Sequence, residues 1–129
     1  MGTSPAAKSS AETRPGQDWL PLKPDLFAIL LVLLEDDCHG YGIMQRATRQ
    51  SGGRTQLQPG ALYRLLKRLL DGGLVAEVDR RLVDAQSDER RRYYSITEFG
   101  RQVAAAEAQR MAELVRVSRA HRLIEGSES

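Results

Sequence analysis

The sequence predicts a mainly α-helical fold that carries a small β-hairpin and ends in a long helix. Three observations support this class. Apolar residues recur at helical spacing, two short runs alternate with period two, and 129 residues leave room for one modest core. The longest apolar run, Leu26 to Leu34, is about half the ~20 residues of a membrane helix, so it is interpreted as a buried core helix.

The first part of the chain is expected to hold a tail and two helices. Residues 1–18 contain almost no large apolar side chain and are expected to stay flexible. A first helix is predicted from about Pro24 to Glu35, since proline suits the first turn of a helix. A second, short helix is predicted over residues 40–50, where Ser51-Gly52-Gly53 ends the pattern.

A third helix and a hairpin are predicted next. The helix begins at Pro59 and stops at Gly72-Gly73. The polar run from Asp84 to Glu89 is interpreted as the loop of an antiparallel hairpin. The two flanking strands are predicted from alternating side chains, namely Leu74, Ala76 and Val78 in one and Arg92, Tyr94 and Ile96 in the other.

A long C-terminal helix is predicted to start at Thr97-Glu98 and to reach about Leu123. About 26 residues span nearly ~40 Å, more than a domain this small can cover, so the excess is expected to pack on a second copy. The predicted dimer contacts are its apolar residues Ala104, Ala108, Met111, Leu114, Val115 and Leu123.

The third helix separates leucines from cations. At about 100° per residue, Leu62, Leu65, Leu66, Leu69 and Leu70 share one arc, and the other arc carries Arg64, Lys67 and Arg68. The preceding turn, Gln58-Pro59-Gly60-Ala61, is small enough to approach base edges, and Gln58 offers an amide to adenine. Taken alone, these cations are better explained by a solvated helix face.

The basic hairpin favours the DNA-binding interpretation. A recognition helix followed by a cationic hairpin is the order of a winged helix-turn-helix, and the hairpin would lie over the DNA backbone or reach a minor groove. Its cations are Arg80, Arg81, Arg90, Arg91 and Arg92. We therefore expect residues 19–97 to form the DNA-binding domain, residues 98–124 the dimerisation helix and residues 125–129 a disordered tail.

Composition argues against several other functions. The formal net charge of +2 is too small to indicate nucleic acid by itself. Cys38 is the only cysteine, which excludes an internal disulfide and makes a reducing cytoplasm the expected compartment. With His39 and His121 it does not form a metal-ligand pattern, and no nucleophile or phosphate-binding loop is recognisable. The sequence thus predicts no metal, no cofactor, no membrane association and no enzymatic activity.

Three stretches of the chain resemble the signature sequences of the PadR family of bacterial transcriptional regulators: HGYGIMQRATRQSGG, QPGALYRLLKRLLDGGLV and ERRRYYSITEFGR. The resemblance covers about residues 24–123. It implies a winged helix-turn-helix that dimerises through its C-terminal helix and represses promoters until an effector or stress signal releases it. The single C-terminal helix, with no further helices after it in this sequence, is similar to the smaller PadR subclass.

The resemblance also assigns DNA-contact residues. Tyr41 matches the tyrosine of the family's His-Gly-Tyr motif, whereas Gly42 stands where the family usually has Glu. The start of the family's recognition helix is matched by Gln58, Pro59, Gly60 and Tyr63, with Arg64 and Lys67 on the same face. The implied partner is a pseudo-palindromic double-stranded operator bound by a homodimer.

Three further interpretations stay open at this point. Some relatives bind flat aromatic drugs at the dimer interface, and Trp19 with Met111 is a possible effector site, unless Trp19 only pins the tail to the first or last helix. The same scaffold also suits a protein-interaction module that docks an acidic partner, or a regulator of another winged-helix family.

Overall fold

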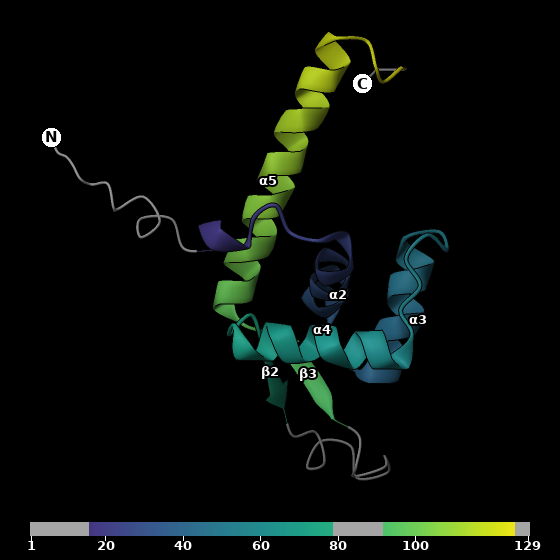
Figure 1. Ribbon diagram of the computed structural model, residues 1–129, viewed down its shortest axis with the longest axis vertical. Coiled ribbons are helices and arrows are strands. Elements are labelled where there is room, and N and C mark those ends of the chain that lie inside the picture. Colours follow the sequence, from purple (N-terminus) through teal and green to yellow (C-terminus); the bar gives the residue numbers. More distant parts are fainter. Residues whose placement is uncertain (1–15, 79–91, 126–129) are drawn as a thin grey trace, which may run out of the picture.

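The computed structural model describes residues 16–78 and 92–125 (Figure 1). Most of the predicted tail, the hairpin loop and residues 126–129 therefore lie outside the described residues. In chain order the described elements are η1 (Gln17–Trp19), α2 (Pro24–Glu35), β1 (Cys38–His39), α3 (Gly40–Gln50), α4 (Pro59–Asp71), β2 (Val75–Val78), β3 (Tyr93–Ile96) and α5 (Glu98–Ala120).

The predicted bounds of the first three helices are confirmed. Proline opens α2 and α4, and glycine or serine follows α3 and α4, so local backbone chemistry sets these ends. Helix α5 ends at Ala120, three residues before the predicted end. Arg122 adopts a left-handed conformation (φ 62°), and the Leu123 amide donates back to the Ser118 carbonyl over 2.9 Å. This Schellman-type turn stops the helix.

The sheet has three antiparallel strands in the order β1-β3-β2, rather than the two that were predicted. Strand β1 pairs Cys38 with Tyr94. Two residues are too few to show an alternating pattern, and for that reason β1 escaped the sequence prediction. The alternating set predicted for this strand, Leu74, Ala76 and Val78, is not its buried face, because Val75 is buried whereas Ala76 is exposed. Leu74 precedes the strand and enters the core, which displaces the alternation by one residue.

Helix α2 lies at the centre of the core and packs against α3, α4, α5 and β3. Its buried residues are Leu26, Ile29, Leu30, Val32 and Leu33. Only the N-terminal part of α5 covers this core, and the rest of the helix projects from the body of the molecule (Figure 1). Among the described residues, no helix has the length and apolar character needed to cross a membrane.

The start of α5 is tied to the chain that follows α4. The Thr97 hydroxyl accepts a hydrogen bond from the Gly100 amide over 3.0 Å and donates to the Gly73 carbonyl over 2.6 Å. Gly100 lies against the Leu74 carbonyl, where a Cβ would collide with that oxygen. The predicted N-cap is thus confirmed, and it fixes α5 relative to both α4 and the sheet.

Candidate nucleic-acid interface

Helix α4 buries its leucines and exposes its polar face. Leu62, Leu66 and Leu69 are fully buried, while Leu65 and Leu70 are partly buried. The opposite face presents Arg64 and Lys67 to solvent, together with Tyr63, which is 51% exposed. The predicted separation of core from cationic face is therefore confirmed.

The N-terminal turn of α4 is open. Gln58 is the exposed N-cap residue, yet its side chain makes no capping hydrogen bond, so its amide is available to a ligand. Pro59 and Gly60 are exposed and Ala61 is half-buried. A Cβ at Gly60 would meet no atom within 4 Å, so the protein's own packing does not require glycine there. Close approach of an external ligand is a physical reason for a small residue.

Two tyrosines lie near the junction of α3 and α4. The Tyr63 hydroxyl lies against the first residue of α3, Gly40, where a Cβ would come within 2.5 Å of it. Tyr41 follows directly, is 61% exposed and accepts a hydrogen bond from Gln45 over 3.2 Å. The two predicted contact tyrosines thus lie at one place on the surface, with Gly40 allowing their helices to approach.

The two other cations of α4 have protein partners. Lys67 forms an ion pair with Asp71 over 3.2 Å, and both side chains are well exposed. The Arg68 guanidinium carbon lies 5.4 Å from the centre of the Trp19 ring, at the edge of α4 nearest η1. Arg68 therefore packs on Trp19 while it stays exposed, one helical turn along the same face from Arg64, and its contact with DNA stays a prediction.

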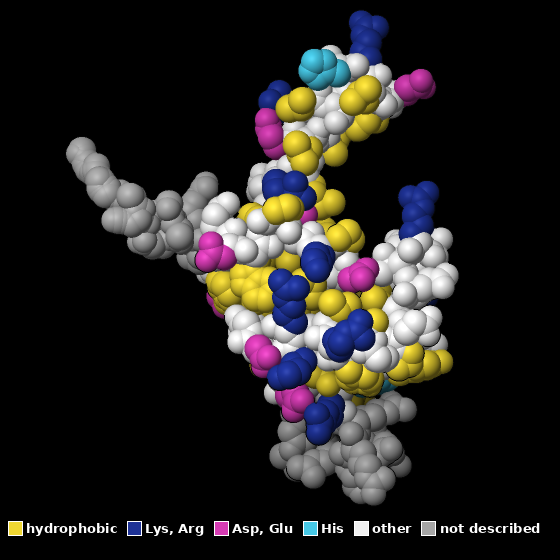
Figure 2. Space-filling view, in the orientation of Figure 1, with side chains coloured by type: hydrophobic (Ala, Val, Ile, Leu, Met, Phe, Trp, Pro, Cys, Tyr) yellow, Lys and Arg dark blue, Asp and Glu magenta, His cyan; other side chains and the backbone are white. Residues whose placement is uncertain are grey.

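Sequence reasoning missed part of the basic surface. From Cys38 to Leu70 the chain has no acidic residue and six cations. Beyond those of α4, they are Arg46 and Arg49 in α3 and Arg54 in the following loop. Arg49 and Arg54 are exposed, and the absence of acids over both helices is the signal that would have identified them. Figure 2 shows Lys and Arg side chains spread over the face on which α4 lies.

The predicted wing is the hairpin formed by β2, β3 and the residues between them. The structure describes only the residues at its base. Arg92 pairs with Glu77 of the neighbouring strand over 3.4 Å, and both are exposed. The other predicted wing residues, Arg81, Arg90 and Arg91, lie outside the described residues, as does Arg80. Of the wing cations predicted to contact DNA, the structure thus places only Arg92.

His39 has a structural role and Cys38 is inaccessible. The His39 Nδ1 accepts a hydrogen bond from the Gly42 amide over 3.1 Å and caps α3, while the ring packs edge-on against Tyr93. Burial raises the pKa of the Cys38 thiol, so it stays protonated at neutral pH. In the part of the chain that the structure describes, no three His, Cys, Asp or Glu side chains are grouped for metal binding.

The structure reveals a buried acid that was not predicted. Glu107 in α5 is only 2% exposed and accepts hydrogen bonds from Arg110 over 2.8 and 2.7 Å and from the Leu22 amide over 3.2 Å. The Arg110 hydrogen bonds lower the pKa of Glu107, whereas burial acts in the opposite direction. Glutamate in a helix is normally solvated, but Glu107 shares a face with Ala104 and Met111, and that position was its available signal.

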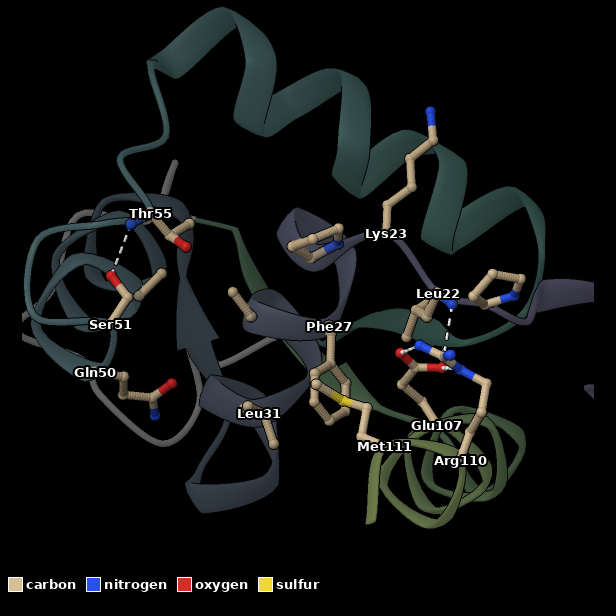
Figure 3. A pocket seen from close by; sticks show the side chains of 14 residues that line it. Leu22, Lys23, Phe27, Leu31, Gln50, Ser51, Thr55, Glu107, Arg110 and Met111 are labelled. Carbon is tan, nitrogen blue, oxygen red and sulfur yellow. Dashed lines mark hydrogen bonds and ion pairs between the residues drawn. The ribbon is translucent and has the colours of Figure 1, made fainter. Parts of the chain in front are cut away.

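A groove of about 560 Å³ lies between α2, the end of α3, the segment before α2 and α5. Figure 3 shows Phe27, Leu31 and Met111 between the Glu107–Arg110 pair on one side and Gln50, Ser51 and Thr55 on the other. Met111 therefore lines a pocket, as predicted. Trp19 does not line this groove but a second, smaller pocket beside Arg68. The predicted Trp19–Met111 site is therefore corrected, because the two residues line different pockets.

The predicted dimer residues fall into two groups. Ala104 is 4% exposed and belongs to the core of the protomer, so its assignment to a dimer contact is corrected. Beyond Glu107 no described residue of α5 is buried. The outer residues are exposed: Ala108, Met111, Leu114, Val115 and Leu123. Figure 2 shows apolar side chains along the projecting part of α5.

The sequence matches the model of the transcriptional regulator PadR-like family over residues 29–106. No curated protein sequence matches the chain.

Solved structures share the fold at low sequence identity. A transcriptional regulator from Clostridium thermocellum is 22% identical, with a TM-score of 0.62 over 81% of this chain and 94% of that one. A PadR family transcription regulator from Clostridium difficile is 24% identical, with a TM-score of 0.62 over 77% and 98%. Bacillus subtilis PadR, solved in complex with operator DNA, is 22% identical, with a TM-score of 0.55 over 67% and 46%.

Proposed function

Because the chain belongs to the transcriptional regulator PadR-like family, and is therefore a DNA-binding regulator rather than an enzyme, we propose that it is a homodimeric repressor that reads its operator with α4. The observation that carries this proposal is the exposed, acid-poor face of α4, with an open N-terminal turn at Gln58 and Gly60. The solved Bacillus subtilis complex with operator DNA supports the choice of partner.

The residues divide into two kinds of contact. Gln58 and the small turn beside it are suited to base edges in the major groove, where an amide can bind adenine through two hydrogen bonds. Tyr41, Tyr63 and Arg64 are suited to phosphates, which fix the register of the helix on the duplex. Lys67 can also contact a phosphate once DNA displaces Asp71, because an exposed ion pair such as Lys67–Asp71 adds little free energy of stabilisation.

The dimer is supported by the uncovered face of α5. At about 100° per residue, Met111, Leu114 and Val115 continue the same face that packs in the core through Val103 and Ala104. The protomer core ends at Glu107, but the apolar face of α5 continues beyond it. A second copy related by two-fold symmetry would cover it and present two recognition helices to a pseudo-palindrome.

DNA binding can be tested with the region upstream of the protein's own gene. Fluorescence anisotropy at several salt concentrations should show specific binding, and Arg64→Ala should weaken it and lower the salt slope by about one unit. Asp71→Asn should tighten binding because it frees Lys67 and removes a negative charge. Arg119→Ala, which removes an exposed cation from the outer part of α5, is the matched control and should change neither quantity.

The same assay decides between a regulator and an adaptor. A repressor prefers its operator over random-sequence competitor DNA, whereas a protein-interaction module shows no such preference. Equal affinity of the wild-type protein for both DNAs would contradict the proposed function.

The groove favours a small-molecule signal as the means of release. Its volume lies within the ~300–1,000 Å³ range of ligand sites, and its lining is largely apolar. It also joins α5 to the end of α3, so an occupant would contact the helix-turn-helix and the proposed dimer helix at once.

Planar aromatic compounds titrated into methionine-methyl-labelled protein should shift the Met111 resonance and weaken operator binding. Of the two other methionines in the sequence, Met44 is described and does not line the groove, so its resonance serves as an internal control. If no compound moves the Met111 resonance selectively, this part of the proposal is wrong.

A further inference from the structure

The single tryptophan of the chain contacts the C-terminal end of α4. Besides lying beneath Arg68, the Trp19 ring fills the space next to Gly72, where a Cβ would collide with Cζ2 and come within 2.9 Å of Cη2. Gly72 itself has φ −86° and ψ −4°, a conformation open to any residue. The ring, rather than the backbone, is therefore what requires glycine at this position.

The segment that carries Trp19, residues 16–23, is attached to α5 on its other side. Gly16 approaches Val103 so closely that a Cβ would lie 2.6 Å from its Cγ2. The Leu22 amide donates to the buried Glu107, and the Leu22 side chain is 4% exposed. Both ends of the segment thus rest on the part of α5 that belongs to the core, and η1 lies beside that helix in Figure 1.

We propose that Trp19 is a positioning residue that holds the C-terminal end of α4 against the α5-anchored segment. The inference rests on the proposed reading of DNA by α4. The N-terminal end of that helix is seated separately, by Tyr63 against Gly40. Trp19 fixes the C-terminal end of α4. Together the two contacts set the angle at which the exposed face of α4 enters the major groove of DNA. Base readout depends on placement within about half an ångström.

The collision at Gly72 supplies a specific test. Gly72→Ala should displace the ring and weaken operator affinity at least about fivefold, while affinity for random DNA stays nearly constant. Phenylalanine lacks the Cζ2 and Cη2 atoms of the indole, so Gly72→Ala should cost much less in a Trp19→Phe background. This coupling, measured as a double-mutant cycle, distinguishes positioning by the ring from general damage. Gln17→Ala, on the exposed side of the same segment, is the control.

Tryptophan emission reports the contact directly, because no other tryptophan contributes. Gly72→Ala should shift the emission to longer wavelength as the ring becomes more exposed. Should Gly72→Ala fail to fold, Trp19→Leu removes the ring without overpacking and should also lower the operator-to-random affinity ratio. Positioning by Trp19 is refuted if Gly72→Ala shifts the emission but leaves the operator-to-random affinity ratio at the wild-type value. An unchanged ratio in a folded Trp19→Leu variant would refute it equally. A wild-type ratio of one would instead refute the proposed function.

Discussion

Glu107 shows how a single buried charge organises this small protein. Its carboxylate oxygens receive three hydrogen bonds, two from Arg110 in the same helix and one from the Leu22 backbone. An unpaired carboxylate at 2% exposure would be costly, so these partners are needed for burial to be tolerated. Through the Leu22 amide the charge also fixes the segment that carries Trp19, far away in sequence. A helix residue thereby determines where the N-terminal segment lies.

Replacing this acid should destabilise the protein selectively. We expect Glu107→Gln to lower the free energy of unfolding by about 1–3 kcal/mol, because Arg110 and the Leu22 amide lose a charged acceptor. Glu113→Gln is the matched control, since Glu113 pairs with Arg116 at the same i,i+3 spacing on an exposed surface. Urea denaturation should show no measurable change for that control. Equal effects of the two substitutions would mean that burial of Glu107 adds nothing.

The lowered pKa of Glu107 also predicts the direction in which stability changes with pH. A carboxyl whose pKa is lower when folded stabilises the protein fully above its unfolded value, about 4.3, and loses that contribution as pH falls through the folded value. Wild-type Tm should therefore drop more steeply below about pH 4.3 than the Tm of Glu107→Gln. Parallel acid profiles would contradict this linkage.

At the scale of elements, prolines and glycines predicted the bounds of the helices better than the pattern of apolar side chains predicted the strands. The bounds of α2, α3 and α4 followed from prolines and glycines, which act on the backbone locally. Strand β1 and the facing of β2 did not follow, because they depend on pairing with β3 and on the entry of Leu74 into the core. The exposed face of α4 was predictable from its own period.

The rest of the candidate site depends on contacts between distant segments. The pairing of Arg68 with Trp19 joins residues of α4 and η1, and no local pattern indicates it. The need for glycine at Gly42 is likewise not indicated by any sequence pattern, although its neighbour is close in the chain. In this chain the Cys38 thiol occupies the space, since a Cβ at Gly42 would lie 2.6 Å from Sγ. Such close contacts become visible only once the fold is known.

The seating of α4 on α3 leads to a prediction about Gly40. Gly40→Ala should force the Tyr63 hydroxyl away and tilt the start of α4, lowering operator affinity about tenfold at a temperature where the variant is still folded. Gly42→Ala is a control in the same helix, because its Cβ meets Cys38 on the far side from Tyr63. Anisotropy titrations should show that this control loses stability but keeps its affinity. Similar affinities for both variants would show that the Tyr63 contact does not place α4.

At the scale of the whole molecule, α5 divides into two functional parts. Its first turns hold the core and, through Glu107, the segment that supports one end of α4. Its outer turns extend the same apolar face beyond the core without a cover. If a second copy covers them, the position of each recognition helix is linked through α5 to that of its counterpart. The groove beside Met111 lies on this link, where an effector would act on both.

The oligomeric state should therefore depend on the outer face of α5. Leu114→Asp places a charge at the centre of the uncovered stripe, where a dimer interface would have to desolvate it. Gln109→Asp introduces the same charge on the opposite face of the helix and serves as the control. In sedimentation equilibrium the wild-type protein and the control should have twice the 14.4 kDa mass of one chain, and Leu114→Asp should have the mass of a monomer. The monomer should still fold, because Leu114 lies outside the core, but it should bind a full operator no more tightly than a half-site. A monomeric wild-type protein would show that no second copy covers this face. A variant that stays dimeric at micromolar concentration would show that the dimer forms through another surface.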